Sequence, residues 1–346
     1  MSTDLRVACL GAGYFARFHH DAWHRLEHCS LVGVCDTNVR RASESAAAAF
    51  TDIETMLGSV SPDILDIITP PHTHADAIAT AIDHGVKVII CQKPFCETFA
   101  QAEATVKQAE LADVLLVVHE NFRFQPWFRQ IRQALDDHAL GDLHQACFRL
   151  RTGDGQGPDA YLERQPYFQT MQRLLMHETG VHYIDTFRYL FGEACAVYAD
   201  LKKRNPVIAG EDAGLVVFDF PNQLQATFDG NRHLDFAAKN TRLTFGDFCI
   251  EGSRGTLSLS GDGQVVHREH GKLLTRVLLD SRSWPGFAGD CVRALQQHVV
   301  SHLLDGSTIE NAARDYLQVL RLERIVYESD AQSRKLLIDL KEAVRD

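Results

Sequence analysis

The chain has no long hydrophobic run and no concentrated block of positive charge. Its 346 residues are 45% hydrophobic, but its longest apolar runs are typified by Val114–Val118, far short of the roughly 20 residues that a membrane helix needs. The N-terminus has no basic segment followed by an apolar one, so we expect no secretory signal. With 35 basic and 46 acidic residues the formal net charge is −11. We therefore expect neither a membrane protein nor a nucleic-acid-binding protein.

The nine cysteines include no C-x-x-C pair. They are odd in number and widely scattered, so neither a zinc ribbon nor a thioredoxin-like motif is supported. Several lie inside apolar runs, such as Val-Ala-Cys-Leu at residues 7–10, where a thiol behaves as a small hydrophobic group. We expect a reducing compartment and hence a cytoplasmic protein.

Short apolar runs alternate with longer helical patterns over the first 120 residues. The length alone suggests two domains, because one core rarely grows past about 250–300 residues. Continuous apolar runs fit strands buried on both faces of a parallel sheet, and the alanine-rich segments 39–50 and 75–84 are long enough for crossover helices. The predicted strands span residues 6–10, 31–35, 64–69, 86–91 and 114–118. We expect a doubly wound α/β domain over residues 1–122.

The pattern changes after residue 122. β-rich segments follow one another closely and are joined by turn residues, which suggests a largely antiparallel sheet. These segments span residues 197–204, 215–220, 224–230, 242–250 and 256–259, with helical patterns at 180–190, 287–304 and 309–329. We expect residues 123–346 to form an α+β domain that carries the substrate site and the subunit contacts.

A glycine-rich turn, Gly11-Ala-Gly13-Tyr-Phe-Ala16, directly follows the first predicted strand. Gly11 would allow a tight turn, Gly13 would let a pyrophosphate approach the backbone, and Ala16 is small enough for close helix–sheet packing. Asp36 ends the second predicted strand, where a carboxylate can accept a hydrogen bond from a ribose 2′-hydroxyl. This spacing predicts a Rossmann domain that binds NAD rather than NADP, because Asp36 would repel a 2′-phosphate. The candidate cofactor contacts here are Gly11, Gly13, Tyr14, Phe15, Ala16 and Asp36.

Polar residues also follow the next three predicted strands, at the sheet edge where ligands bind in open α/β folds. Thr69-Pro-Pro-His-Thr-His74 follows the third strand, Gln92-Lys93-Pro94 the fourth and His119-Glu-Asn121 the fifth. A lysine directly after a buried strand can donate a hydrogen bond into a crevice, whereas without these neighbours it would be interpreted as a solvent-exposed loop lysine. The further candidate cofactor contacts are Thr69, Pro70, His74, Gln92, Lys93 and Asn121.

The second domain contains the segment Met176-His-Glu178-Thr-Gly180-Val-His182-Tyr-Ile-Asp185. It does not fit an H-E-x-x-H zinc site, because histidines five residues apart lie about 140° apart on a helix. If the segment is helical throughout, Glu178, His182 and Asp185 share one face. An imidazole flanked by carboxylates can serve as an acid or base with an orienting partner. The alternative is an ordinary cluster of surface ion pairs.

Two further groups of residues leave their roles open. His20, His24 and His28 recur at helical spacing, but no nearby cysteine or acid completes a site, so we expect no metal. The second group contains two tyrosines and an arginine. Tyr161 and Tyr167 precede the His182 segment, and Arg123 follows the fifth predicted strand. These residues either shape a substrate pocket or serve only local packing.

Together these motifs resemble the Gfo/Idh/MocA family of oxidoreductases. The resemblance covers most of the chain, and the motifs occur in the family's order. They are the fingerprint with Asp36, Thr-Pro-Pro-x-x-His at 69–74, x-Lys-Pro at 92–94, Gly-x-His-x-x-Asp at 180–185 and Asn-Pro-x-x-x-Gly-Glu-Asp at 205–212. The combination is specific, although no single motif is.

The resemblance implies an NAD-dependent dehydrogenase acting on a CH–OH group of a sugar, inositol or related polyol. In that family the lysine of Glu-Lys-Pro and the histidine of Asp-x-x-x-His line the nicotinamide and the reacting hydroxyl, and they correspond to Lys93 and His182. Gln92 replaces the usual glutamate here, and Glu178 stands where aspartate is commoner. The expected catalytic residues are Lys93, His182 and Glu178. The expected substrate contacts are Lys93, Arg123, Tyr161, Tyr167, Glu178 and His182.

Two other functions stay open on the same fold. One is a non-catalytic, NAD-sensing regulatory protein, which would need the fingerprint but neither Lys93 nor His182. The other is a dehydrogenase of a non-sugar substrate such as a dihydrodiol. In each case we expect a homodimer or homotetramer, because one face of the antiparallel sheet is left without a covering layer.

Overall fold

The computed structural model describes residues 4–339 and divides into two compact units. The first unit comprises the residues up to Asn121 together with Asp290–Gln318, and the second comprises Phe122–Gly289 together with the residues from Val319 on. The sequence predicted a single boundary at residue 122. The chain instead returns to the first unit through helix α9 (Cys291–Asp305), because this helix packs against helix α1 (Ala16–His24).

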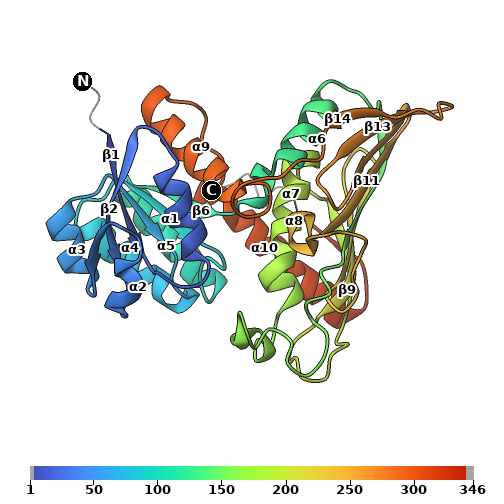
Figure 1. Cartoon of the computed structure of the whole chain (residues 1–346). Helices are drawn as coiled ribbons and strands as arrows, with labels where there is room; N and C mark the ends of the chain where they lie inside the picture. Colours follow the sequence, from blue (N-terminus) through green and yellow to red (C-terminus); the bar gives the residue numbers. More distant parts are fainter. Residues whose placement is uncertain (1–3, 340–346) are drawn as a thin grey trace. The chain divides into compact units, whose positions relative to one another are not determined.

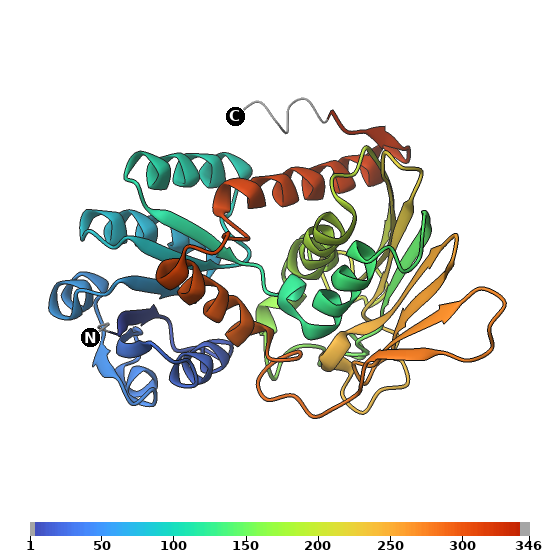
Figure 2. The ribbon, with the colours of Figure 1, turned by 90° about the horizontal axis from the view of Figure 1, so that it is seen from above.

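The first unit is built on a six-stranded parallel sheet with the order β3-β2-β1-β4-β5-β6. Figure 2 shows this sheet between two layers of helices. The strands are β1 (Leu5–Leu10), β2 (Cys29–Cys35), β3 (Ala48–Phe50), β4 (Ile64–Ile67), β5 (Val88–Gln92) and β6 (Leu115–His119). The other helices of this unit include α2 (Val39–Ser43), α3 (Ile53–Val60), α4 (His74–Asp83) and α5 (Phe99–Leu111). The strand order reverses between β1 and β4, the place where such sheets bind ligands, and the predicted doubly wound α/β fold is confirmed.

One predicted helix is wrong. Residues 39–50 do not form a continuous crossover helix, because α2 ends at Ser43 and Ala46 adopts a positive φ of 59°. The last residues of this alanine-rich run form β3, which pairs in parallel with β2. Pairing at the sheet edge here overrides the helix propensity of alanine.

The second unit contains a nine-stranded sheet with the order β14-β13-β12-β11-β7-β10-β9-β8-β15. Its described strands pair antiparallel, except that β7 and β10 run parallel, so the prediction of a largely antiparallel sheet is confirmed. The strands are β7 (Leu143–Leu150), β8 (Ala196–Lys202), β9 (Ala213–Asp219), β10 (Gln225–Asn231), β11 (Gly246–Gly252), β12 (Gly255–Leu259), β13 (Val265–Glu269), β14 (Arg276–Leu279) and β15 (Leu336–Leu337).

Helices lie against one face of this sheet (Figure 1). They include α6 (Pro126–Asp136) and α7 (Val181–Phe191), and a short α8 (Thr241–Thr244) occupies the start of the segment 242–250 that the sequence predicted as strand. Helix α10 (Ala313–Gln332) begins in the first unit and ends in the second.

Aromatic rings fix α7 on the sheet. Tyr183 of α7 lies 4.1 Å, centroid to centroid, from Phe148 of β7 and 5.0 Å from Phe228 of β10. Phe187, one turn later, stacks on Phe248 of β11 at 5.9 Å. These rings are all almost completely buried, so the position of α7, and with it that of His182, is set by the core of this unit.

Candidate active site

The glycine-rich turn connects β1 to α1 in the first unit. Gly11 has a φ of +110°, and a Cβ added to it would lie 2.8 Å from the carbonyl oxygen of Ile68, so glycine is required. A Cβ added to Gly13 would meet nothing within 4 Å. No side chain caps the N-terminus of α1, where oriented N–H groups suit a phosphate. These features fit the pyrophosphate of a dinucleotide.

Two aromatic residues lie between this turn and α1. Tyr14 is 37% exposed, and the Arg17 guanidinium carbon lies 4.3 Å from the centroid of its ring. Phe15 is half-buried, with its ring 5.4 Å from that of Phe18. Ala16 is buried at the first position of the helix, as expected for close packing of α1 on the sheet.

Asp36 follows β2 and is joined directly to the glycine-rich turn. Its Oδ2 accepts a hydrogen bond from the backbone N–H of Ala12 at 2.8 Å, and its Oδ1 accepts one from the N–H of Asn38 at 2.8 Å. The residue remains half-buried. The carboxylate therefore holds the turn in place, a role that the sequence pattern did not indicate, and is fixed at the strand end where the ribose is expected.

His74 links the segments that follow β4 and β5. Its Nδ1 lies 3.0 Å from the carbonyl oxygen of Phe95 and its Nε2 lies 2.7 Å from that of Thr69. The ring is completely buried, and this burial lowers the pKa of His74. His74 thus connects two loops. Thr69 and Pro70 remain partly exposed, so they are the more accessible of the cofactor contacts predicted in this segment.

Lys93 directly follows β5, and its backbone is fixed by the preceding side chain. Gln92 is buried; its Oε1 accepts a hydrogen bond from the N–H of Lys93 at 2.8 Å, and its Nε2 lies 3.1 Å from Nε2 of His19. Lys93 itself is half-buried. Asn121 is buried, and its Nδ2 donates to the Cys291 sulfur at 3.2 Å.

His182 stands near the start of α7 in the second unit. Its imidazole lies flat on the ring of Phe122, with centroids 3.8 Å apart and planes 3° apart. Phe122 in turn meets Tyr183 edge-on at 5.8 Å and Phe245 at 5.1 Å. Both His182 and Phe122 are buried, so the plane of the imidazole is set by its stacking partner.

The continuous helix that would align Glu178, His182 and Asp185 is not present. A π-helical turn over Leu175–Gly180 precedes α7 and changes the spacing of Glu178 relative to His182. Asp185 accepts hydrogen bonds from Nε and Nη2 of Arg123 at 2.8 and 2.5 Å. Arg123 and Asp185 are both buried, so the predicted substrate contact at Arg123 forms an internal ion pair.

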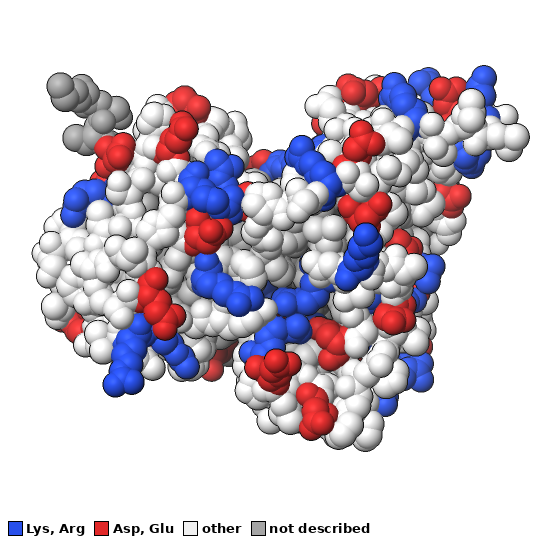
Figure 3. Space-filling model, viewed as in Figure 1, with Lys and Arg blue, Asp and Glu red and all other residues white. Residues whose placement is uncertain are grey.

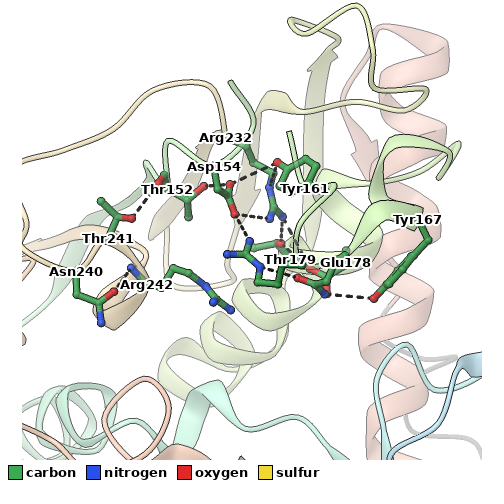
Figure 4. A network of polar contacts seen from close by, with 12 residues as sticks. Thr152, Asp154, Tyr161, Tyr167, Glu178, Thr179, Arg232, Asn240, Thr241 and Arg242 are labelled. Carbon is green, nitrogen blue, oxygen red and sulfur yellow. Dashed lines mark hydrogen bonds and ion pairs between the residues drawn. The ribbon is translucent and has the colours of Figure 1, made fainter. Parts of the chain in front are cut away.

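Glu178 belongs to a polar network centred on Arg232 (Figure 4). The guanidinium donates from Nη1 to Thr179 Oγ1 at 2.6 Å, and the Thr179 hydroxyl donates to Glu178 Oε2 at 3.0 Å. Arg232 Nη1 also lies 3.8 Å from Glu178 Oε2. Arg232 is buried while Glu178 is half-buried, so the arginine fixes the carboxylate from the interior of the unit.

The other side of Arg232 meets Asp154 and Tyr161. Nε donates to the Tyr161 hydroxyl at 2.8 Å, and Nη2 donates to Asp154 Oδ2 at 3.2 Å. Burial opposes ionisation of Asp154, but the Arg232 and Arg164 charges together with the hydrogen bonds from Thr152 and Arg232 outweigh it, so the pKa of Asp154 lies below its usual value. Burial raises the pKa of the Tyr161 phenol, so this hydroxyl stays protonated at neutral pH.

The predicted substrate contacts in this region therefore differ in accessibility. Tyr161 is 6% exposed within the network, whereas Tyr167 is 56% exposed and its hydroxyl accepts from Gln165 Nε2 at 3.2 Å. Sequence reasoning missed Asp154 and Arg232, which lie far apart in the chain and in no motif. The Gly-Asp-Gly segment at 153–155 is typical of a flexible loop, so its sequence does not indicate the contact of Asp154 with Arg232.

Residues 4–339 contain neither a cluster of metal ligands nor a membrane-spanning helix. There, no three histidine, cysteine or acidic side chains gather so as to hold a metal ion. No helix in the same range combines the length and the apolar character needed to cross a bilayer. On the face drawn in Figure 3, basic and acidic side chains are interspersed over each unit.

Comparison with protein families matches both parts of the chain. The model of an oxidoreductase family with an NAD-binding Rossmann fold matches residues 5–120. The model of the GFO/IDH/MocA C-terminal domain matches residues 128–258. The NAD-binding fold predicted from the glycine-rich turn and Asp36 is thereby confirmed.

Individual relatives match over nearly the full length. The D-apiose dehydrogenase of Paraburkholderia graminis is 30% identical, covering 97% of this chain and 90% of its own. The inositol 2-dehydrogenase of Rhizobium meliloti is 26% identical, with 96% and 99% covered. A crystal structure of an oxidoreductase from Agrobacterium radiobacter in complex with NAD⁺, L-tartaric acid and magnesium superposes with a TM-score of 0.86 at 26% identity, covering 97% and 98% of the two chains. The chain belongs to the Gfo/Idh/MocA family of NAD-binding oxidoreductases.

Proposed function

We propose that this protein is an NAD-dependent dehydrogenase that transfers a hydride between the nicotinamide and a carbinol carbon of a sugar, inositol or related polyol. The observation that carries the proposal is the joint presence of a dinucleotide-binding turn and two groups suited to alcohol oxidation, Lys93 and His182. The printed names of the relatives, D-apiose dehydrogenase and inositol 2-dehydrogenase, favour a polyhydroxylated substrate.

The residues that would hold NAD are those of the first unit's turn. Gly13 offers an unobstructed backbone, and the uncapped N-terminus of α1 suits the pyrophosphate. Asp36 would accept hydrogen bonds from the adenosine ribose and disfavour a 2′-phosphate. When bound, the nicotinamide supplies the hydride acceptor, and the protein supplies position and electrostatics.

His182 and Lys93 would have different roles at the reacting hydroxyl. His182 would take the hydroxyl proton as a general base, with its ring plane already set by Phe122. Lys93 would donate a hydrogen bond to the same oxygen, which gains negative charge as the carbon–hydrogen bond breaks. Both assignments follow the family resemblance, residue by residue.

Glu178 would bind a second hydroxyl of the substrate. Its carboxylate is half-buried and is held through Thr179 and Arg232. A carboxylate fixed in this way accepts hydrogen bonds from sugar hydroxyls in a defined direction. The exposed phenol of Tyr167 would add a further contact.

The proposed assembly is a homodimer or homotetramer formed through the second unit. Tyr198 of β8 and Leu215 of β9 project from the sheet face opposite α7, and they are 37% and 41% exposed. An uncovered sheet face with apolar residues is a common subunit contact. Light scattering at micromolar concentration tests this: a dimer or tetramer is expected, and a monomer would contradict it.

The direct test of the function is an NAD⁺ reduction screen over pentoses, hexoses, inositols and simple alcohols, with dihydrodiols as the non-sugar comparison. We expect NADH formation with one class of polyhydroxylated compound and none with simple alcohols. NADH binding without turnover of any compound would favour a regulatory protein instead. Turnover of dihydrodiols alone would show that the substrate class is wrong.

A further inference from the structure

A buried carboxylate lies in the core of the NAD-binding unit, outside the proposed catalytic groups. Asp66 of β4 is completely buried between the equally buried Leu65 and Ile67. Its Oδ2 accepts hydrogen bonds from His19 Nδ1 and Trp23 Nε1, each at 2.8 Å, and a longer one from Gln296 Nε2 at 3.3 Å, while Oδ1 has no partner among residues 4–339. Burying a charge is costly, so the fold alone does not account for an aspartate at this position.

The carboxylate selects the ring nitrogen of His19 that donates to it. Burial opposes ionisation of Asp66, but the pKa of Asp66 still lies below its usual value, and the hydrogen bonds from His19 and Trp23 favour the ionised carboxylate. A carboxylate can only accept hydrogen bonds. His19 therefore carries a proton on Nδ1. Its Nε2 faces the amide nitrogen of Gln92, which is a donor only, so Nε2 carries the lone pair.

The lone pair of His19 in turn fixes the amide of Gln92. The Gln92 nitrogen lies 3.1 Å from His19 Nε2 and donates to it, which places Oε1 2.8 Å from the N–H of Lys93. Each donor in the series meets an acceptor: Lys93 N–H to Gln92, Gln92 to His19, and His19 to Asp66. Every bond in this hydrogen-bond chain therefore points from donor to acceptor toward Asp66, because the carboxylate can only accept.

We propose that Asp66, His19 and Gln92 are positioning residues that hold Lys93 for hydrogen bonding to the substrate oxygen. The proposal rests on the proposed function for the role of Lys93 itself. It also accounts for Gln92, where the family usually has glutamate. A carboxylate facing the lone pair of His19 would be repelled unless the imidazole took up a second proton.

The first test uses two variants, one at each of the residues that donate to Asp66 at 2.8 Å. His19→Asn keeps a donor toward Asp66 but removes the acceptor for Gln92, so kcat should fall about 10- to 100-fold, the usual effect of misplacing a catalytic group by about 1 Å. KM for NAD⁺ should change less than about threefold. Trp23→Phe removes a donor that is not part of the chain, so it should lower thermal stability and leave kcat within about twofold of wild type.

The second pair of variants tests the acceptor at residue 92. Gln92→Leu should reduce kcat as much as His19→Asn does. Gln92→Glu retains an acceptor for the N–H of Lys93 and should keep kcat within about threefold of wild type, with His19 doubly protonated. If kcat instead follows thermal stability through all four variants, the chain is only structural and the proposal is wrong.

A readout on the protein without substrate separates this proposal from the proposed function. Nitrogen NMR of ¹⁵N-histidine-labelled protein, with His19 assigned from its loss in His19→Asn, should show Nδ1 protonated and Nε2 unprotonated. A proton on Nε2 would overturn the proposal whatever the enzyme does. A wild type with the expected tautomer that oxidises no alcohol would overturn the proposed function, and with it the catalytic benefit to Lys93, but not the hydrogen-bond chain.

Discussion

The imidazole of His182 lies parallel to the ring of Phe122, with 3.8 Å between their centroids. Phe122 is held from its edge by Tyr183, which belongs to the aromatic core of the second unit. A general base must meet the reacting hydroxyl in the plane of its ring nitrogens. The core of this unit therefore orients the proposed base before any substrate binds.

Phe122→Leu tests this orientation. Leucine still fills most of the space but offers no flat surface, so the imidazole gains rotational freedom and kcat should fall about tenfold. Phe128→Leu is the matched control, because Phe128 is equally buried and packs at an angle against the rings of Phe148 and Phe248, away from His182 in the aromatic contacts it makes. The control should lose stability without a comparable loss of kcat. Equal kcat values for the two variants would show that stacking on His182 does not matter.

His182→Ala should lower kcat for alcohol oxidation by about 10²–10⁴-fold, the usual contribution of general acid–base catalysis. Wild-type oxidation should decrease at low pH, because a protonated imidazole cannot accept the hydroxyl proton, and the variant should lack this decrease. His144→Ala, which removes an exposed histidine on β7, should behave as wild type. If His182→Ala retains the kcat and pH profile of wild type, the histidine is structural and Lys93 becomes the better candidate for the base.

Lys93→Met should also lower kcat strongly, because it removes the donor to the oxygen that gains charge. NADH binding, followed by fluorescence, should change little, since we assign it to Gly11, Gly13 and Asp36. Loss of NADH binding in parallel with kcat would place Lys93 in cofactor binding instead.

Asp36→Ala should weaken NAD⁺ binding and relieve the rejection of NADP⁺, because the carboxylate repels a 2′-phosphate. The same carboxylate accepts the N–H of Ala12, so a stability loss of about 1 kcal/mol should accompany the change. The ratio of kcat/KM for the two cofactors measures the effect. A wild type that prefers NADP⁺ would contradict it.

Stability should fall in mild acid because of His20. Burial lowers the pKa of His20 from 6.5 to about 4. A histidine with a lowered folded-state pKa stabilises the protein fully above pH 6.5, and this contribution is lost as the pH falls toward 4. The shift corresponds to about 3 kcal/mol. Urea unfolding at pH 7 and pH 4.5 should show a smaller difference for His20→Leu than for wild type; an unchanged difference would assign the acid sensitivity to other groups.

Local signals were sufficient for much of the fold. Buried strands such as β4 and β5 are continuous apolar runs, and the turn after β1 has steric requirements that glycine alone meets at Gly11. The residues expected at strand ends, including Asp36 and Lys93, are found there. Short-range patterns carry this information because each depends on a few neighbouring residues.

Long-range packing could not be predicted in the same way. The return of α9 to the first unit depends on its contact with α1, far away in sequence. Strand β7 reads Leu-His-Gln-Ala-Cys-Phe-Arg-Leu, which has only a weak alternation, yet it lies within the large sheet. The roles of Arg232 and Asp66 likewise depend on contacts with residues of other elements.

The most direct test of the proposed reaction follows the hydrogen itself. A polyol that the enzyme oxidises is prepared with deuterium at the reacting carbinol carbon, and the reduced cofactor is analysed by mass spectrometry and proton NMR. The account predicts one deuterium at C4 of the nicotinamide, on a single face, with none lost to water. Deuterium appearing in the solvent, with unlabelled NADH, would contradict direct hydride transfer.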